Sequence, residues 1–461
     1  MYQVPPARAW YATLFLMLLY SISYVDRYAL SLLAAPISAM LHIPDVEMGL
    51  LFGAGFGVMY SLTGLPLAHV IDRYKRVPIV AGGVILWTAS TLASGFASGF
   101  PALLLCRSGV AIGEAVLSPA AISIIGDLFT REKRTFPTSL YVAIAGFMQA
   151  GAFVVCGFTI DLANRVAKVV PLAPWRLTLI LLGSSGIVLG VLFYCTLREP
   201  ARSTETGNFG SAREAAGYFW QERALFGWMF IGMAAMGASG AAFLAWTPTL
   251  LIRAFHESTA YAGYLFGTVG TGAALFSAFC WPALVAAGAR LGYRSAPVML
   301  LAAGLGIAII SIAVAGTTSS ITVMMVAVGL AMFGVGASGI LPPLIIQYVS
   351  PSRMRGRLVA VNFMASSLIG LPLGPPLAAA IAESFYSGSH AIGYAMTAIA
   401  AACAPVAILA ILLSRHRFIM ALDCAIRRES SPENHTHPPA ARESLRAEAR
   451  GAREKADRSV P

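Results

Sequence analysis

The chain has 461 residues, of which 57% are hydrophobic and 11% are charged, whereas an average soluble domain carries about 25% charged residues. This composition excludes a soluble globular protein and indicates a protein that crosses a membrane many times. The formal net charge is +11, but the basic residues lie in short clusters between apolar runs, so we expect no nucleic-acid partner.

Apolar stretches near 20 residues long, separated by Pro, Gly and charged clusters, predict twelve membrane-spanning helices. In chain order they cover residues 10–40, 48–70, 78–98, 101–129, 135–160, 175–197, 225–251, 259–287, 295–316, 319–348, 356–382 and 389–414. Because the first stretch is long and holds a charged pair, we expect a retained helix rather than a cleaved signal.

An internal repeat divides the chain. The segment DRYKRVPIVAGG after the second span resembles RLGYRSAPVMLLAAG after the eighth, with Pro78 and Pro297 in corresponding positions. The sequence therefore predicts an all-α membrane protein with two pseudo-symmetric six-helix bundles. They comprise residues 1–197 and 225–414, are joined by a cytoplasmic linker at 198–224, and are followed by a polar, largely disordered tail at 415–461.

Most of the 32 Lys and Arg residues lie in the loops on the side of the N-terminus and in the tail. Because basic loops stay in the cytoplasm, we expect both termini there. Abundant Ala and Arg with few Lys is typical of a GC-rich bacterial genome. For a bacterial protein of this kind we expect the inner (plasma) membrane as the location and a monomer as the oligomeric state.

Four charged residues lie deep inside predicted spans, away from the span ends: Asp26 and Arg27 in the first, Arg107 and Glu114 in the fourth. A charge at the bilayer centre costs about 2.5–3.5 kcal/mol, so these residues should face the bundle interior and find partners. Arg107 and Glu114 share one stripe of the helix, about 10 Å apart along its axis. Asp26 and Arg27 point about 100° apart, so we expect one to face the fourth helix and the other the cavity.

The hypothesis for these four residues is proton coupling. Asp26 and Glu114 would carry the coupling proton, while Arg27 or Arg107 would orient an anionic head group or release a carboxylate. The alternative is an ion-pair network that only fixes helix packing.

The second half carries no Asp, Glu, Lys or Arg deep in a span between Leu225 and Glu383. A cavity that is charged on one wall and apolar on the other suits an amphiphile. The residues proposed to line it are Tyr20, Tyr60, Gln149, Trp246, Tyr264, Phe333, Ser338 and Asn362. For each of them, ordinary packing or lipid contact is the alternative.

The loop AHVIDRYKR, from Ala68 to Arg76, resembles the signature after the second helix of the major facilitator superfamily. Asp72, Arg73 and Arg76 match that signature, while Ala68 and Lys75 replace its usual glycines. The resemblance implies that Asp72, Arg73 and Arg76 belong to a cytoplasmic gate between the halves.

A narrower resemblance is to the Spinster-like branch of that superfamily. It rests on Tyr24-Val25-Asp26-Arg27-Tyr28, on Arg107 with Gly109, Gly113-Glu114-Ala115 and Pro119, on Asp127-Leu128-Phe129, and on Trp246-Thr247-Pro248. In that branch the four intramembrane charges form the proton-coupling and substrate-orienting centre. The loop between the eighth and ninth spans departs from the family pattern because it lacks an Asp.

These features favour a secondary active transporter, proton-coupled and working by alternating access, for an amphipathic or lipid-like organic molecule. The alternative is a proton-coupled symporter of a small organic anion such as a sugar acid or aromatic acid. An enzyme is not expected: GASG at 237–240 matches the GxSG of intramembrane serine proteases, but no His lies centrally in a span to act as base. Six scattered cysteines without a CxxC pair suggest neither metal nor cofactor.

Overall fold

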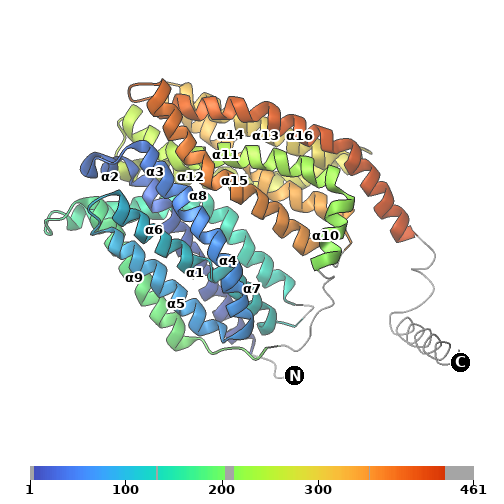
Figure 1. Ribbon diagram of the computed structural model, residues 1–461, viewed down its shortest axis with the longest axis horizontal. Coiled ribbons are helices and arrows are strands. Elements are labelled where there is room, and N and C mark those ends of the chain that lie inside the picture. Colours follow the sequence, from blue (N-terminus) through green and yellow to red (C-terminus); the bar gives the residue numbers. More distant parts are fainter. Residues whose placement is uncertain (1–4, 131–132, 203–211, 352–353, 431–461) are drawn as a thin grey trace, which may run out of the picture.

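The computed structural model describes residues 5–130, 133–202, 212–351 and 354–430, and within these ranges all regular secondary structure is α-helical (Figure 1). The first half consists of α1 (Pro6–Leu32), α2 (Ala34–Leu41), α3 (Asp45–Phe52), α4 (Ala54–Arg73), α5 (Arg76–Ser94), α6 (Phe100–Glu114), α7 (Leu117–Leu128), α8 (Thr135–Val166) and α9 (Pro174–Thr196). The second half consists of α10 (Ala212–Gln221), α11 (Arg223–Ala254), α12 (Thr259–Arg290), α13 (Ala296–Thr317), α14 (Ile321–Val349), α15 (Arg355–Phe385) and α16 (Ala391–Ser430).

Among the described residues, eleven helical segments are long and apolar enough to cross a membrane, and α15 lies where the remaining span was predicted. Three predicted spans are interrupted. The first breaks at Leu33, the second at Gly53 and the fourth after Glu114, so each is built from two consecutive helices.

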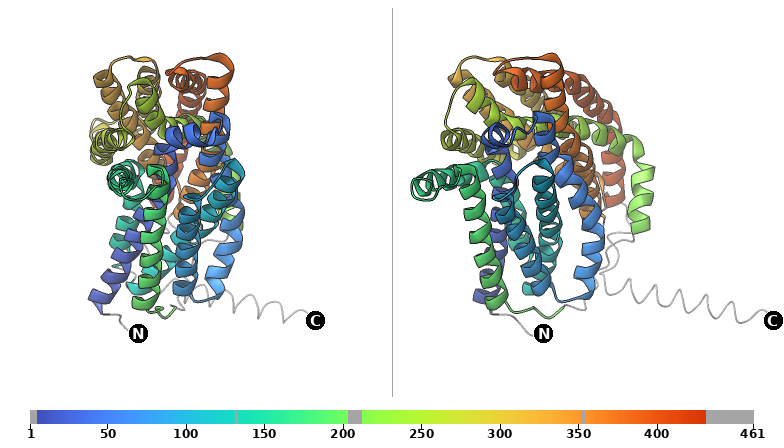
Figure 2. Two further views of the ribbon diagram at one scale, coloured as in Figure 1. Left: turned by 90° about the vertical axis from the view of Figure 1, so that its left-hand side faces the viewer. Right: turned by 60° about the vertical axis from the view of Figure 1, so that its left-hand side comes forward.

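The two six-span halves form two bundles, as predicted. In both views of Figure 2, the blue-to-green helices of the first half lie mostly below the light-green-to-red helices of the second half. Small residues let helices within and between the bundles approach closely, as is usual in membranes.

Two segments contain more helix than the sequence suggested. Within the expected linker, α10 packs against the second half, because Tyr218 donates a hydrogen bond of 2.7 Å to the carbonyl of Val349. The last helix, α16, continues to Ser430, so residues 415–430 of the expected disordered tail are helical. Phe418 and Ala421 are buried, which explains why the helix does not stop at the membrane edge. Residues 431–461 lie outside the described ranges.

The halves meet at the end away from the N-terminus, which we call the distal end: the loops at 42–45, 166–174, 255–258 and 386–390. A Cβ added to Gly49 would lie 2.7 Å from the Cα of Pro376, and one added to Gly157 would lie 2.8 Å from the carbonyl oxygen of Ala260. Such close approaches require glycine.

The opposite end, which we call the basic end, comprises the described parts of the loops at 73–76, 129–130, 133–134, 197–202, 290–295, 350–351 and 354–355. Toward it, a Cβ added to Gly64 of α4 or to Gly146 of α8 would meet no described atom within 4 Å. In Figure 1 the ribbons of the two bundles meet near α3 and diverge toward the N-terminal end of the first bundle. The described halves are therefore joined at the distal end.

Candidate functional site

An ion pair between the first and fourth spans forms the centre of the candidate site. Nη2 of Arg27 on α1 lies 2.6 Å from Oε2 of Glu114 on α6. The Glu114 side chain is 1% exposed and that of Arg27 is 21% exposed. A charge-assisted hydrogen bond of this length is strong, and Arg27 is the partner that reaches open space.

Arg107 makes a different set of bonds. It is buried, its Nε donates to the carbonyl of Leu51 at 3.2 Å, and its Nη2 donates to the carbonyl of Arg27 at 3.1 Å. Leu51 lies just before the break at Gly53, where φ and ψ are −95° and −88°. Arg107 thus ties α6 to α1 and to the interrupted second span.

Asp26 is buried on another side of α1. In the described part of the chain, neither of its carboxylate oxygens has a hydrogen-bond partner. Its charged neighbours are Glu114 and Arg107 of α6, and its polar neighbours are Trp87 and Thr91 of α5. We expected one residue of the Asp26–Arg27 pair to face the fourth helix and the other the cavity. Arg27 both pairs with Glu114 of the fourth span and is partly exposed, while Asp26, turned about 100° away, is buried near α5 and near the charged groups of α6.

Aromatic rings surround the Arg27 guanidinium. Its central carbon lies 5.1 Å from the ring centre of Tyr24, 4.6 Å from that of Phe56 and 5.7 Å from that of Tyr60. The Arg107 guanidinium lies 4.7 Å from the same Phe56 ring. Both cations are therefore close enough to the Phe56 ring to be attracted by it, which offsets part of their mutual repulsion.

A row of tyrosines extends from this site along α1. Tyr20, Tyr24 and Tyr28 share one face of the helix at a spacing of four residues, which is a signal that sequence reasoning missed. Tyr141 of α8 stacks on Tyr20 with ring centres 4.8 Å apart, and Phe153 lies 5.0 Å from Tyr28. The first-half wall of the site is thus aromatic as well as charged.

Three of the residues proposed to line a cavity lie on first-half helices: Tyr20 on α1, Tyr60 on α4 and Gln149 on α8. All three are half-buried. Tyr60 belongs to the aromatic surround of Arg27, and Gln149 lies beside Tyr28. The structure brings these three together with the ion pair.

The residues proposed on the second-half wall are scattered. Trp246 is fully buried, donates to the carbonyl of Pro375 at 2.8 Å and packs edge-on against Phe52, so it lines no cavity in this conformation. Tyr264 donates to Asp161 at the distal end, at 3.0 Å. The remaining three are Phe333, which stacks on Trp281, Ser338, which bonds the carbonyl of Val335, and Asn362, which is buried.

The predicted gate residues also separate. Arg76 is buried, pairs with Asp127 of α7 and with Glu199 at 2.8 Å, and donates to the carbonyl of Pro200 at 3.0 Å. These partners all belong to the first half and the segment after α9.

Asp72 and Arg73, by contrast, are exposed. Arg202 holds the end of α4 by donating to the backbone carbonyls of Ile71, Asp72 and Tyr74. Sequence reasoning did not include Arg202 or Glu199 in this network.

Residues 16–371 match the sequence pattern of the Major Facilitator Superfamily, which is more than half of the chain. The chain belongs to the Major Facilitator Superfamily. It is therefore a transporter and not an enzyme. In the described part of the chain, no three His, Cys, Asp or Glu side chains are grouped as metal ligands.

Several relatives of known name are similar to this superfamily member. An MFS-type efflux pump of Mycolicibacterium smegmatis is 31% identical over 58% of this chain and 60% of its own length. A probable L-galactonate transporter of Escherichia coli is 26% identical over 75% of this chain and 77% of its own. The sphingosine-1-phosphate transporter SPNS2 of Danio rerio is 27% identical over 50% of this chain and 46% of its own.

Among solved structures, a bacterial homolog of the human lysosomal transporter Spinster, in an inward-facing and unoccupied conformation, has the same fold. It superposes with a TM-score of 0.77 at 24% identity, covering 93% of this chain and all of the other. This superposition confirms the major facilitator fold. The resemblance to the Spinster-like branch is confirmed by Protein spinster homolog 3 of Danio rerio, which is 28% identical over 82% of this chain and 77% of its own length.

Proposed function

We propose that this transporter is proton-coupled and moves an amphipathic or lipid-like organic molecule between its halves by alternating access. In this proposal it resides in the inner membrane with both termini in the cytoplasm, so the basic end faces the cytoplasm. The conformation described above, with the halves joined at the distal end, is then the inward-facing one.

The observation that carries the proposal is the Arg27–Glu114 pair, in which the cation is partly exposed and the carboxylate is buried. An anionic head group entering from the basic end competes with Glu114 for Arg27. A buried carboxylate that loses its cationic partner is then neutralised by a proton. Substrate binding and proton uptake are linked through one side chain, with Asp26 as the second carboxylate of the relay.

The opposite wall supports an amphiphile as the substrate. Between Leu225 and Glu383 the charged residues lie near helix ends or in loops. Ser239, Thr247 and Ser277 are buried there, but no charge faces the site from mid-span. A hydrophobic body fits against such a wall while its head group meets Arg27, and SPNS2 is by name a transporter of a phosphorylated lipid.

The test is proton flux in liposomes that contain the purified protein, an imposed pH gradient and an internal pH dye. Lysophospholipids, sphingoid bases and small carboxylates are added in turn. We expect flux with an amphiphile, and we expect Glu114→Gln to abolish it because Gln keeps the shape of the side chain but cannot exchange the proton. Asp26→Asn is measured in parallel.

The matched control is Glu257→Gln, which makes the same change in the loop between α11 and α12. It should keep full flux. If Glu114→Gln transports like the unaltered protein while its melting curve is unchanged, the four charges only fix helix packing and the proton-coupling proposal fails.

The second candidate is a proton-coupled symporter of a small organic anion, favoured by the similarity to the probable L-galactonate transporter. Flux with sugar acids or aromatic acids and none with amphiphiles would select it. Arg27 and Glu114 keep the same roles in that case, since a carboxylate also competes for the guanidinium.

We retain the proposal that Asp72 and Arg73 belong to the cytoplasmic gate. Both are exposed at the basic end, where they are available to the second half when that end closes. In this proposal Arg76 acts indirectly: it holds α5, α7 and the segment at 199–200 together next to the loop between α4 and α5.

A further inference from the structure

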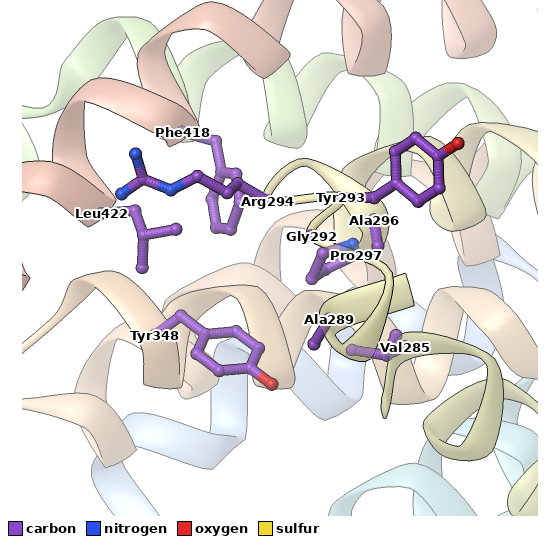
Figure 3. Close-up of a pocket in the computed structure, with 10 residues that line it drawn as sticks. All are labelled: Val285, Ala289, Gly292, Tyr293, Arg294, Ala296, Pro297, Tyr348, Phe418 and Leu422. Carbon is purple, nitrogen blue, oxygen red and sulfur yellow. The ribbon is translucent and has the colours of Figure 1, made fainter. Parts of the chain in front are cut away.

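A cavity separate from the candidate transport site lies at the basic end of the second half (Figure 3). It is enclosed by the last turns of α12 and α14, the loop that leads into α13, and the part of α16 beyond the predicted span. Its volume is about 200 Å³, and its lining is mainly apolar: Val285, Ala289, Ala296, Pro297, Phe418 and Leu422. None of the described residues of the first half lines it.

The rim of this cavity is basic. Figure 3 shows Arg294 extending across one side and the Tyr348 ring forming another. Arg294 pairs with Asp423, but the two side chains are 50% and 41% exposed, so this bridge is weak and open to exchange. Arg290, the last residue of α12, is also exposed, and Arg415 donates to Ser295 at 3.2 Å. The α12–α13 loop and the facing part of α16 thus carry more positive than negative charge.

The depth of the cavity identifies its surroundings. α12, α13 and α14 are membrane-spanning helices, and the cavity lies where α12 ends and α13 begins. The ends of membrane-spanning helices lie near the boundary between the hydrocarbon core and water, where lipid head groups are found. An apolar cleft with a positive rim at that level complements a molecule with an acyl chain and a negatively charged head.

We propose that this cavity binds a phospholipid with a negatively charged head group. The glycerol and the first part of one acyl chain lie against the apolar lining, and the phosphate meets Arg290 and Arg294 in place of Asp423. The bound lipid links the α12–α13 loop to α16. This proposal is independent of the transported substrate, because the site shares no residue with the Arg27–Glu114 pair.

The test is lipid binding to the full-length protein in detergent, measured by native mass spectrometry with phosphatidylglycerol and with phosphatidylcholine. We expect preferential retention of phosphatidylglycerol. Arg290→Gln and Arg294→Gln should each weaken it about fivefold, because one basic residue near an anionic lipid contributes on that order. Arg198→Gln, the same change at an exposed residue of the first half at the basic end, is the matched control and should have no effect.

A second variant separates the cavity from surface charge. Ala289 lines the cleft but is exposed, so Ala289→Trp fills the space without disturbing the core. We expect this variant to lose phosphatidylglycerol while keeping its melting temperature in lipid-free detergent. Unchanged binding in Ala289→Trp, equal retention of the two lipids, or displacement of the lipid by millimolar glycerol phosphate would each overturn the proposal.

Discussion

At the scale of single residues, Phe56 is the least expected member of the site. It is apolar and buried, yet two arginine guanidiniums lie near its ring centre, Arg27 at 4.6 Å and Arg107 at 4.7 Å. Within a bilayer the surrounding lipid is as apolar as the ring, so burial alone contributes little. The attraction between ring and cations therefore dominates what Phe56 adds to stability.

We predict that Phe56→Leu lowers the free energy of unfolding by about 2 kcal/mol, which is the scale of a desolvated cation–π contact. Thermal melting in detergent measures this change. Phe158→Leu is the matched control, because Phe158 is exposed on α8. Equal melting temperatures for the two variants would show that the arginines do not depend on the ring.

Also at the scale of single residues, Arg76 and Arg73 differ in burial, although the sequence resemblance assigned both to one gate. Arg76 is buried between Asp127 and Glu199, so Arg76→Ala removes the cation that both carboxylates share and should cost about 3–5 kcal/mol. Arg73→Ala removes an exposed side chain and should stay within about 0.5 kcal/mol. Melting temperatures of the two variants test this contrast, which a stable Arg76→Ala protein would contradict.

At the scale of helices, the interrupted second span is the element that links the site to the distal contact. Its first part, α3, packs against α15, where Gly49 meets Pro375 and Pro376. Its second part, α4, begins after the break at Gly53 and carries Phe56 and Tyr60 toward Arg27. Arg107 fixes the break by bonding the carbonyl of Leu51.

We predict that Gly49→Ala opens the distal end, because the added Cβ would lie 2.7–2.9 Å from the backbone atoms of Pro375 and Pro376, which cannot move aside. A cysteine replacing the buried Ser31, in a protein whose six native cysteines are removed, should then be labelled faster by a maleimide. Gly64→Ala is the control, since its Cβ meets no described atom, and it should leave labelling unchanged. Equal rates would contradict the role of Gly49.

At the scale of the whole molecule, the distal contact is polar as well as close-packed. Both Nη atoms of Arg253 donate to the carboxylate of Asp45, at 2.5 and 2.8 Å, and so join α11 to α3. Glu383 of α15 accepts from the backbone N–H of Val46 at 3.2 Å, and Ser31 donates to the carbonyl of Ala245. In alternating access these bonds must break when the distal end opens.

We predict that Asp45→Asn or Arg253→Gln shifts the balance between the two conformations about fivefold toward the distally open one. Such a shift corresponds to about 1 kcal/mol for a half-exposed pair. The labelling of a cysteine at position 31 measures it, and the charge reversal Asp45→Arg with Arg253→Asp should restore the original rate. Asp423→Asn breaks a pair inside the second half and should have no effect. A shift of equal size there would contradict the prediction.

The sequence by itself determined the number and order of the spans, the two-half organisation and the four charges inside the membrane. These features follow from transfer energies, because about 20 apolar residues cross a bilayer and an ionised group inside it needs a partner. The spans at 10–40 and 48–70 were recognised as units even though each contains a helix break. Local composition carries that information without knowledge of the neighbours.

Only the tertiary structure decided which partner each of the four charged side chains contacts. The sequence could not predict that Arg27 pairs with Glu114, that Arg107 bonds to backbone carbonyls, or that Asp26 packs near α5. The rotation of each helix is set by packing against partners that are distant in the chain. The same applies to Trp246, which was expected in a cavity and is buried beside Phe52 and Pro375 at the contact between the halves. Composition determines which residues must be buried in a membrane protein. Helix packing determines which other residues they contact.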